Sequence, residues 1–452
     1  MLCTWKCAGV CSLSRARHNP LARRFGVRDL RRIASGLVLA AILLNSAAAA
    51  TAKTVDVAAG PGTLQAAIDQ AAAGDVLHLR PGRYVGQITI SRPLTLDGRG
   101  KAAVIGTGEG SAITVKAPNV TLRGLTVTGS GLLLETQDSG IFLSKEATGA
   151  KVINNRVTDN LIGIYIWGAR DAVVASNTVV GRRDLRMSER GNGIQVWNAP
   201  GARVEGNDIR YGRDGIFVTT SKDNVFKNNR FRDLRFGVHY MYTNKSRVER
   251  NVSERNHIGY AIMYSTAIEV RNNRSENDRD RGILFNYANN VTVQDNIVTG
   301  GPEKCMFIYN SNKNVITRNY LSECAIGIHF TAGSERNVIF QNAFVANRTQ
   351  VKYVGTRWLD WSSKGQGNYW SDHVAFDLNS DGIADRAYKP NDLTDQILWR
   401  HPAAKLLVNS PAVQILKWAQ SAFPALHPGG VIDSAPLMMV PDPIKQQLES
   451  GS

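Results

Sequence analysis

A repeat of 22 to 23 residues runs through most of the chain. A Gly followed by two or three apolar residues recurs at Gly140, Gly163, Gly193, Gly215, Gly237, Gly259, Gly282 and Gly327. Cys305 occupies the equivalent position between the last two. An Asn column shares the period, at Asn155, Asn177, Asn207, Asn229, Asn251, Asn273, Asn296, Asn319 and Asn342. Two columns in one phase predict an all-β chain, a right-handed parallel β-helix with Gly and Asn at tight corners and hydrogen-bonded Asn stacks.

Departures from the repeat predict the other segments. One interval of 30 residues predicts a charged loop protruding at 181–190, and the apolar spacing in 63–72 predicts a short helix that caps the open end of the solenoid. The repeat stops at Tyr353, and Ser410 with Pro411 resembles a helix start. We therefore expect a signal peptide over 1–50, a β-helix over 51–352, a small cap over 353–400 and a helical tail over 401–452.

The N-terminus has the pattern of an export signal. Arg28, Arg31 and Arg32 precede an apolar run over 33–44, and a small-residue region follows that predicts cleavage near Ala50. No later stretch reaches the ~20 apolar residues that a membrane-spanning helix needs. The sequence therefore predicts an exported protein.

The basic charge does not indicate a nucleic-acid partner. The formal net charge is +16, but residues 1–50 hold seven Arg and one Lys against a single Asp. Downstream, Lys and Arg are dispersed among Asp and Glu instead of lying on one stripe beside stacking aromatics. We expect no nucleic acid among the partners.

The alternation of strand side chains predicts which residues point outward. Counted from each Gly, positions one and three are apolar and interior, so positions two and four face out. Position two holds Tyr165, Gln195, Phe217, His239, Ala261, Leu284, Phe307 and His329; position four holds Trp167, Trp197, Thr219, Met241, Met263, Asn286, Tyr309 and Thr331. This face has no charged residue at those positions, so we expect either a binding surface or a cover formed by the C-terminal segment or the 181–190 loop.

One cluster on this face has the chemistry of a copper site. Met241 and Met263 share a column in adjacent turns, ~4.8 Å apart by strand spacing, and His239 lies two residues from Met241 on the same side. Thioether and imidazole donors suit Cu(I). His329 shares the column of His239 but lies four turns away, so it cannot join the cluster. A contact surface is the alternative for this stripe.

Two other groups leave alternatives open. Cys305 and Cys324 are either a disulfide, copper ligands or two unpaired thiols, and their predicted offset of up to ~10 Å favours unpaired thiols. Asp377, Asn379, Asp381 and Asp385 have the spacing of a calcium loop, with Gly382 at the turn. The twelfth position is Tyr388 instead of the usual Glu, so an Asx turn is the alternative to calcium.

Several stretches together resemble a known family. GVHYMY at 237–242, NYWSD at 368–372, the 377–385 loop and PALHPGGVIDSAPLM at 424–438 are similar to the NosD family, and the similarity extends over nearly all of the chain after the leader. The resemblance implies a periplasmic, non-enzymatic factor for maturation of nitrous oxide reductase. It implies as partners an ABC transporter of the NosF and NosY type, a NosL-type copper chaperone and the reductase itself.

The resemblance also suggests roles for surface residues. The outward aromatic residues become candidate partner contacts, namely Tyr165, Trp167, Trp197, Phe217, Phe307 and Tyr309, and Met438 and Met439 in the tail become candidate contacts to the permease. The main alternative is a polysaccharide lyase or epimerase on the same scaffold, since a fold does not fix a function. A docking scaffold without metal is the second alternative.

Overall fold

The structure is a computed structural model that describes residues 52–355, 357–391, 401–407, 410–422 and 429–450, with 395, 397 and 399. The predicted leader and its cleavage near Ala50 lie outside these residues.

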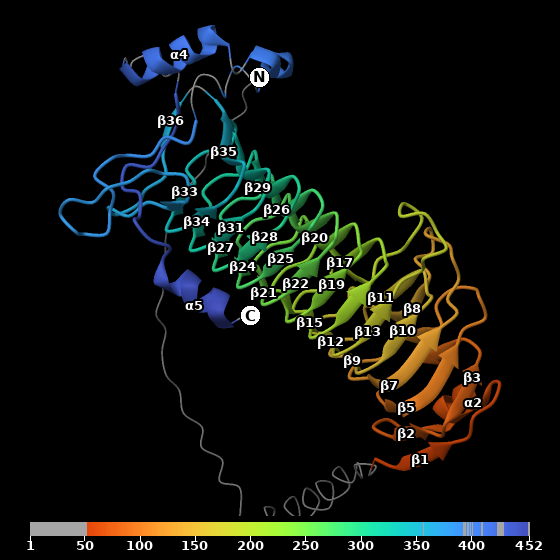
Figure 1. The fold of residues 1–452 in the computed structure, drawn as a ribbon. Helices are drawn as coiled ribbons and strands as arrows, with labels where there is room; N and C mark the ends of the chain where they lie inside the picture. The colour runs from red at the N-terminus through yellow and green to blue at the C-terminus, as the bar shows by residue number, and fades with distance from the viewer. Residues whose placement is uncertain are drawn as a thin grey trace, which may run out of the picture. The chain divides into compact units, whose positions relative to one another are not determined.

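The described residues form a parallel β-helix (Figure 1), as the repeat predicts. One side is a twelve-stranded parallel sheet: β4 (Ile88–Ile90), β6 (Ile113–Val115), β8 (Ser139–Leu143), β11 (Ile162–Trp167), β14 (Ile194–Trp197), β17 (Asp214–Thr219), β20 (Phe236–Met241), β23 (Ile258–Met263), β26 (Arg281–Asn286), β29 (Lys304–Tyr309), β32 (Ile326–Thr331) and β35 (Thr349–Val354).

The remaining sides form a 24-stranded sheet. It begins with β1 (Thr54–Val57), β2 (Val76–Leu79), β3 (Gly82–Val85), β5 (Thr95–Ile105) and β7 (Thr121–Thr128). Because β7 pairs with both β9 and β10, the sheet then divides into two columns. One column holds β9 (Lys151–Ile153), β12 (Val173–Ala175), β15 (Arg203–Glu205), β18 (Val225–Lys227), β21 (Ser246–Glu249), β24 (Ile268–Arg271), β27 (Thr292–Gln294), β30 (Val315–Thr317) and β33 (Val338–Phe340). The other holds β10 (Arg156–Thr158), β13 (Thr178–Val180), β16 (Asp208–Arg210), β19 (Arg230–Arg232), β22 (Val252–Glu254), β25 (Arg274–Glu276), β28 (Ile297–Thr299), β31 (Tyr320–Ser322), β34 (Ala343–Val345) and β37 (Tyr369–Trp370).

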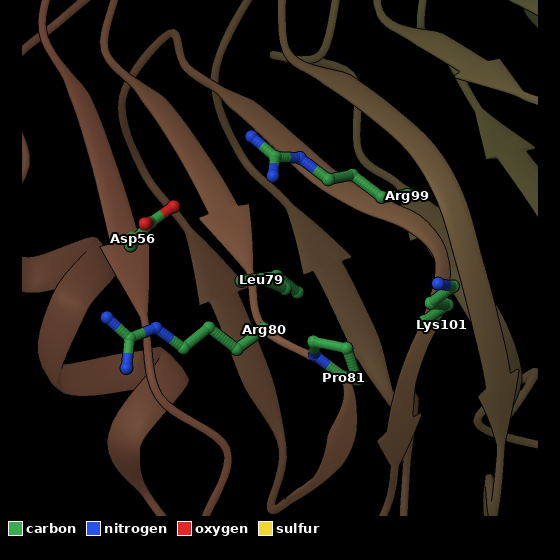
Figure 2. Close-up of a pocket in the computed structure, with 6 residues that line it drawn as sticks. All are labelled: Asp56, Leu79, Arg80, Pro81, Arg99 and Lys101. Atoms are coloured by element: carbon green, nitrogen blue, oxygen red, sulfur yellow. The ribbon is translucent and has the colours of Figure 1, made fainter.

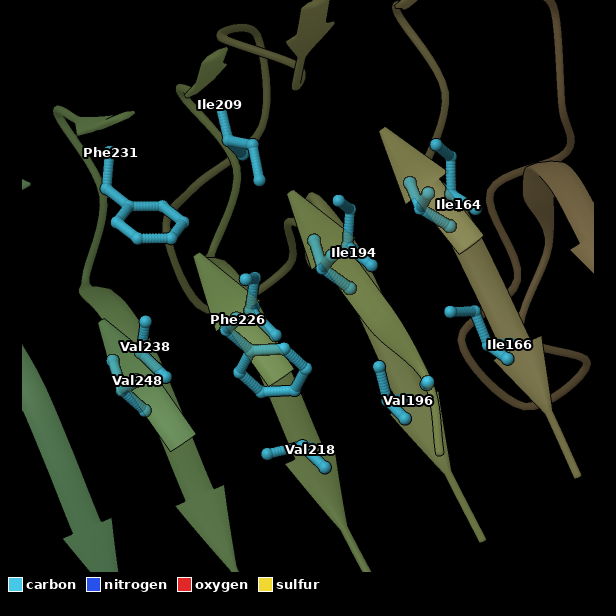
Figure 3. Close-up of a cluster of buried hydrophobic side chains, with 14 of the residues drawn as sticks. Ile164, Ile166, Ile194, Val196, Ile209, Val218, Phe226, Phe231, Val238 and Val248 are labelled. Carbon is cyan, nitrogen blue, oxygen red and sulfur yellow. The ribbon is translucent and has the colours of Figure 1, made fainter. Parts of the chain in front are cut away.

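The core is a set of apolar columns inside the solenoid (Figure 3). Ile164, Ile194, Ile216 and Val238 are register partners in four successive turns, and all are buried. Burying such a side chain contributes about 1.5–3 kcal/mol. Since each turn supplies the same interior positions, the core extends along the stack with the repeat.

The Asn column forms the predicted ladder between turns. The side-chain amide of Asn229 donates to Oδ1 of Asn251 at 3.0 Å and to the Val204 carbonyl at 2.8 Å. The same pattern continues to Asn342, which donates to Oδ1 of Asn368 at 2.9 Å. Asn368 thus extends the ladder one turn beyond the column that the period defines.

The N-terminal end carries the predicted helix. Helix α2 (Thr63–Gln70) buries Leu64 and Ile68 in the core, and Gln65 bonds both the N–H and the carbonyl of Thr89 in β4. The insertion at 181–190 contains no strand and is mostly exposed or half-buried. Both observations confirm the predictions for these segments.

The C-terminal end is closed by segments far apart in sequence. A parallel pair joins β36 (Trp358–Asp360) to β38 (Gly430–Ile432). Asp433 then accepts hydrogen bonds from the Asn368 N–H and the Trp370 indole, both at 2.7 Å. Residues 430–433 are therefore integral to the cap, which differs from the expectation of a separate tail.

The other helices lie in the C-terminal third. The 3-10 helix η1 spans Pro402–Leu407, α4 spans Pro411–Ala422 and α5 spans Asp442–Ser450. The Val413 N–H donates to Oγ of Ser410 at 3.4 Å, so Ser410 caps α4 as its sequence predicts. None of the helices in the described part of the chain is long and apolar enough to span a membrane.

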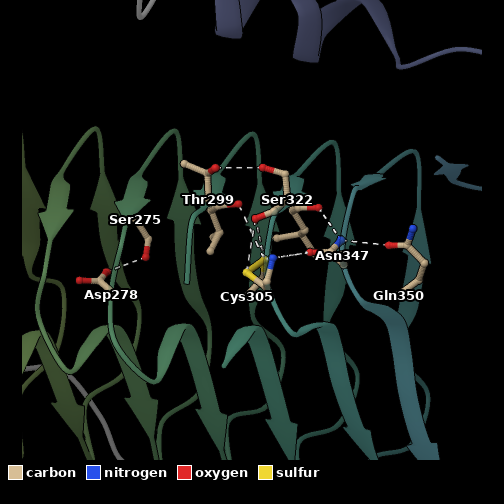
Figure 4. The surroundings of a disulfide bond; sticks show 10 residues. Ser275, Asp278, Thr299, Cys305, Ser322, Asn347 and Gln350 are labelled. Carbon is tan, nitrogen blue, oxygen red and sulfur yellow. Dashed lines mark hydrogen bonds between the residues drawn. A yellow bond between two sulfur atoms is a disulfide. The ribbon is translucent and has the colours of Figure 1, made fainter. Parts of the chain in front are cut away.

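The expectation of two unpaired thiols is wrong, because Cys305 and Cys324 form a disulfide (Figure 4). Their Cα atoms lie 5.7 Å apart, so the corner before β32 folds back toward the start of β29. Strand spacing alone overestimated the separation because it ignored that corner. The bonded sulfurs are not available as thiolate ligands for copper.

Candidate functional site on the outer face of the twelve-stranded sheet

The outer face of the twelve-stranded sheet is partly covered by its own corners. Ile258, Ala261 and Leu284 form a second apolar cluster apart from the main core, and Met263 and Phe307 pack against it. At the N-terminal turns, the Gln195 amide donates to Oε1 of Gln137 in the 131–138 loop. The face therefore has a partly buried apolar floor, and the 131–138 loop reaches it at Gln195.

The predicted aromatic contacts fall into separate groups on this face. Trp167 and Trp197 stack with ring centroids 5.5 Å apart, and Phe142 lies against both Tyr165 and Trp167. Phe307 and Tyr309 both lie in β29, six turns beyond Trp167 and five beyond Trp197, with their ring centroids 6.2 Å apart. Partner binding by these residues stays a prediction.

The structure brings His239, Met241 and Met263 together as predicted. Met241 and Met263 are register partners in β20 and β23, and His239 pairs with Ala261 two residues earlier. Both Met side chains are half-buried, whereas His239 is only 7% exposed. Phe217 and Phe236 flank the imidazole, with ring centroids at 5.0 and 4.8 Å.

A buried carboxylate orients this histidine. Nδ1 of His239 lies 2.9 Å from Oδ2 of Asp214, in the preceding turn. Arg235 binds the same carboxylate through two hydrogen bonds, from Nε at 2.8 Å and from Nη2 at 2.6 Å. Burial opposes ionisation of Asp214, but the hydrogen bonds from His239 and Arg235 outweigh it and hold the pKa of this carboxyl below its ordinary value.

This arrangement leaves the other imidazole nitrogen unpaired. With the carboxylate accepting at Nδ1, the proton of a neutral imidazole lies on Nδ1 and the Nε2 lone pair is free. Nε2 of His239 is buried and has no hydrogen-bond partner in the described part of the chain. A carboxylate that fixes the tautomer of a histidine is the usual support for a metal ligand.

The donor set fits a soft cation better than a hard one. No group of three or more His, Cys, Asp or Glu that could hold a metal occurs among the described residues. An imidazole with two neighbouring thioethers is instead a set that favours Cu(I). The chemistry at His239, Met241 and Met263 is thus compatible with copper as a bound cargo.

The sequence prediction missed Asp214 and Arg235 as parts of this site. Neither residue lies at position two or four, so counting outward strand positions does not include them. The available signal was the register: Asp214 directly precedes Gly215, in the turn before His239. Side chains just before the Gly column reach the outer face from the edge, so the face is less free of charge than its sixteen outward positions suggest.

A tyrosine ladder beside the Met column was also missed. Tyr242, Tyr264 and Tyr287 stack with centroids 5.2 Å apart at each step, and all are exposed. Their φ values are 51°, 49° and 53°, and the same corner of other turns holds Gly168, Asn198, Thr220 or Asn310, all with positive φ. A left-handed conformation costs a residue with a bulky side chain about 1–2 kcal/mol, so three successive turns hold local strain here.

The predicted calcium loop is folded by its own hydrogen bonds. Asp377 accepts from the Gly382 N–H at 2.8 Å, Asp381 from the Ile383 N–H at 2.8 Å and Asp385 from the Leu378 N–H at 2.8 Å. Asn379 accepts from the Asp381 N–H at 3.1 Å. These are the Asx-type turns of the alternative interpretation, and calcium binding here stays a prediction.

The two tail methionines lie at the C-terminal end of the stack. They precede α5 instead of lying on a helix, and the Met438 N–H donates to the Gly382 carbonyl at 3.0 Å. Met439 is exposed beside a shallow pocket that also includes Leu437. Contact between these residues and a permease stays a prediction.

Another pocket lies at the N-terminal turns (Figure 2). Arg80, Arg99 and Lys101 line it together with Asp56, Leu79 and Pro81. None of the predicted site residues lines this pocket.

A solved structure with the same architecture is the A-module of the mannuronan C-5 epimerase AlgE6 from Azotobacter vinelandii. The match has a TM-score of 0.52 at 16% identity, covering 64% of this chain and 90% of that chain. At this identity, the likeness shows the fold alone.

Sequence comparison is more specific. Residues 171–375 match a family model described as periplasmic copper-binding protein (NosD). The chain is 42% identical to the probable ABC transporter binding protein NosD of Stutzerimonas stutzeri, over 80% of this chain and 87% of that protein. It is 40% identical to the protein of the same name from Pseudomonas aeruginosa, over 80% and 88%. These relatives are named as binding proteins, and the family description confirms the predicted periplasmic location. Because the chain is at least 40% identical to both relatives over 80% of its length, it belongs to the NosD family.

Proposed function

We propose that this chain is the periplasmic binding component of an ABC transport system and carries Cu(I) as cargo on the outer face of its β-helix. The relatives' name supports a transporter partner, and the family description supports copper. We locate the copper site at His239 because its Nε2 is buried, has no hydrogen-bond partner in the described part of the chain and lies beside two thioethers.

In this proposal, His239 and the two methionines hold the ion, and Asp214 with Arg235 positions the imidazole. Thioethers are neutral and flexible, so the site binds Cu(I) without fixing a rigid geometry. Such a site is suited to transfer, because the ion can pass to another set of soft ligands. The half-buried methionines leave it accessible from the surface.

The wider role that we propose is non-enzymatic maturation of nitrous oxide reductase. The partners would be a transporter of the NosF and NosY type, a NosL-type copper chaperone and the reductase itself. The outward aromatic residues and the strained tyrosine ladder beside the Met column provide a surface of the composition found in protein interfaces.

The direct test is an anaerobic titration of the purified protein with Cu(I) against a competing chelator. We expect one tightly bound ion in the wild type and its loss in His239→Ala combined with Met241→Leu and Met263→Leu. Leu conserves the volume of Met, so the fold is retained. The matched control is Met439→Leu, an exposed methionine outside the site. Unchanged stoichiometry and affinity in the triple variant would remove the site.

One observation favours a second candidate, a polysaccharide lyase or epimerase. The Asp214 carboxylate, the imidazole of His239 and Arg235 together offer a general base and a cation on the outer face of a β-helix. This candidate predicts turnover of uronate polymers, which ultraviolet absorbance of unsaturated products detects for a lyase and proton NMR of the uronate residues for an epimerase. Robust turnover that His239→Ala abolishes would replace the copper proposal.

A further inference from the structure

The two histidines of the position-two column have opposite electrostatic surroundings. His239 lies against the Asp214 carboxylate. His329, in β32 four turns later, lies among cations: Lys352 is its register partner in β35, and Lys304 and Arg281 belong to the two preceding turns. The column therefore contains one place suited to a cation and one suited to an anion.

The cations near His329 are largely withdrawn from solvent. The side chains of Arg281 and Lys304, which are register partners, are 23% and 16% exposed. Asp280 pairs with both, at 2.5 Å from Arg281 and 3.9 Å from Lys304, and the more exposed Glu303 lies 3.5 Å from Lys304. Arg281, Lys304 and Lys352 all disfavour a positive charge on the imidazole.

An aromatic floor holds these groups together. The Arg281 guanidinium lies 5.0 Å from the centroid of the Phe307 ring, and the His329 ring lies 4.7 Å from it. Phe307 and His329 are register partners in adjacent turns. The guanidinium and the imidazole, from the turns on either side of Phe307, thus contact the same ring.

Two polar atoms of this cluster lack partners. Nε of Arg281 and Nδ1 of His329 are buried and meet no hydrogen-bond partner in the described part of the chain. A buried polar atom without a hydrogen-bond partner destabilises the folded state, and more so where the group is charged. A ligand that accepts hydrogen bonds would remove this penalty.

The protonation state of His329 is consistent with such a ligand. Burial lowers the pKa of this imidazole to about 4, and Lys352, Lys304 and Arg281 lower it in the same direction. At neutral pH the ring is therefore uncharged, with one N–H to donate. An anion bound beside it would favour the protonated form and raise the pKa.

We propose that Arg281, Lys304 and His329 form an anion-binding site on the outer face of the twelve-stranded sheet, which accepts a single oxyanion group. Oxyanions of this class are carboxylate, sulfate and phosphate, and planar guanidinium donors bind them well. This site does not depend on the copper proposal, because it lies four turns away and has the opposite charge preference.

The experiment is an NMR titration of the purified protein with labelled histidine, in which the pKa of His329 is measured with and without ligand. The probes are inorganic phosphate, sodium sulfate and a tetraglutamate peptide. We expect a saturable rise of about 1–3 units in the pKa of His329. A rise with phosphate or sulfate identifies a free oxyanion as the ligand, and a rise with the peptide alone identifies a carboxylate of a partner protein.

The variant that tests the site is Arg281→Gln with Lys304→Gln, which should abolish the saturable rise and raise the pKa of His329 without ligand. Lys245→Gln with Arg247→Gln is the matched control, since it removes the same charge from exposed positions outside the twelve-stranded sheet. Lys304→Gln alone serves if the double variant does not fold, because the next turn has the neutral Ile326 at this position. No saturable shift with any probe, or equal shifts in wild type and variant, would overturn the proposal.

Discussion

At the residue scale, neighbours in adjacent turns decide what each side chain can do. The repeat places His239 and His329 in one outward column, and the sequence predicts that placement correctly. It does not predict that Asp214 bonds one imidazole while cations surround the other. These contacts depend on where the corner side chains point, and corner geometry, unlike strand alternation, has no fixed period.

Asp214→Asn tests whether this carboxylate positions His239. An amide cannot hold the charge that orients the imidazole, so we expect Cu(I) affinity to fall about 10- to 100-fold. Nitrogen-15 NMR should show that His239 loses its preference for the proton on Nδ1. Asp208→Asn is the control, because it breaks a comparable pair with Arg232, at 2.7 and 2.8 Å, on the other sheet. An equal loss of affinity in both variants would indicate a general structural effect.

Asp278 should make stability depend on pH. Burial raises the pKa of this carboxyl from 3.8 to about 7, although Ser275, Ser253 and the Asn256 N–H donate to it. Between about pH 4 and 7 the unfolded chain has released this proton and the folded chain retains it, so stability falls as pH rises.

We therefore expect Asp278→Asn to remove a pH-dependent loss of the order of 4 kcal/mol across that window. Urea unfolding at pH 4.5 and 7 measures it, with Asp223→Asn at an exposed corner as the control. The assignment would be contradicted if the stability of the wild type did not fall between pH 4.5 and 7. It would also be contradicted if both variants showed the same pH dependence as the wild type.

At the element scale, the turns repeat because each repeats the same constraints. Gly and Asn columns, apolar alternation and the Asn ladder were all predictable, since every one of them recurs with the period. The disulfide and the tyrosine ladder were not, because each depends on the path of individual corners. Cys324 reaches Cys305 only through a corner that folds back, and Tyr242 adopts a backbone conformation that favours Gly or Asn.

Asn229→Ala tests the contribution of one ladder position. The substitution removes the acceptor of the Asn207 N–H at 3.0 Å and of its side-chain amide at 2.9 Å. The amide keeps its bonds to the Val174 and Glu205 carbonyls, so the buried N–H is the donor left without a partner. We expect a loss of about 2–4 kcal/mol in the free energy of unfolding, from that unpaired donor and from the bonds that Asn229 itself donates to Asn251 and Val204. Arg156→Ala, at an exposed position of the same sheet, should change it by less than about 0.5 kcal/mol. Similar effects of the two variants in urea unfolding would contradict this role for the ladder.

At the scale of the whole molecule, both ends of the stack need cover, because the open end of a solenoid exposes its core. Helix α2 covers the first turns, and its apolar spacing predicted that role. At the other end the sequence predicted a cap over 353–400 but not its partner strand, since the pair joins residues 358–360 to 430–432 across more than seventy positions. Trp361 and Trp370 are buried there, with Trp370 stacked 4.2 Å from Phe344.

Removing residues 429–452 should therefore expose the last turns. We expect a lower melting temperature and a red shift of tryptophan fluorescence, as Trp361 and Trp370 become hydrated. Removing 441–452 alone deletes α5 but keeps Asp433, so its effect should be smaller. If both truncated proteins melted like the full chain, residues 429–440 would have no capping role.

The central claim is that Cu(I) binds at His239, Met241 and Met263. X-ray absorption at the copper edge tests it most directly, because it identifies the atoms bound to the metal in the anaerobically loaded protein. We expect sulfur scatterers together with one imidazole, and the loss of the imidazole signal in His239→Ala. A copper site with nitrogen and oxygen ligands alone, or an imidazole signal that survives in His239→Ala, would contradict it.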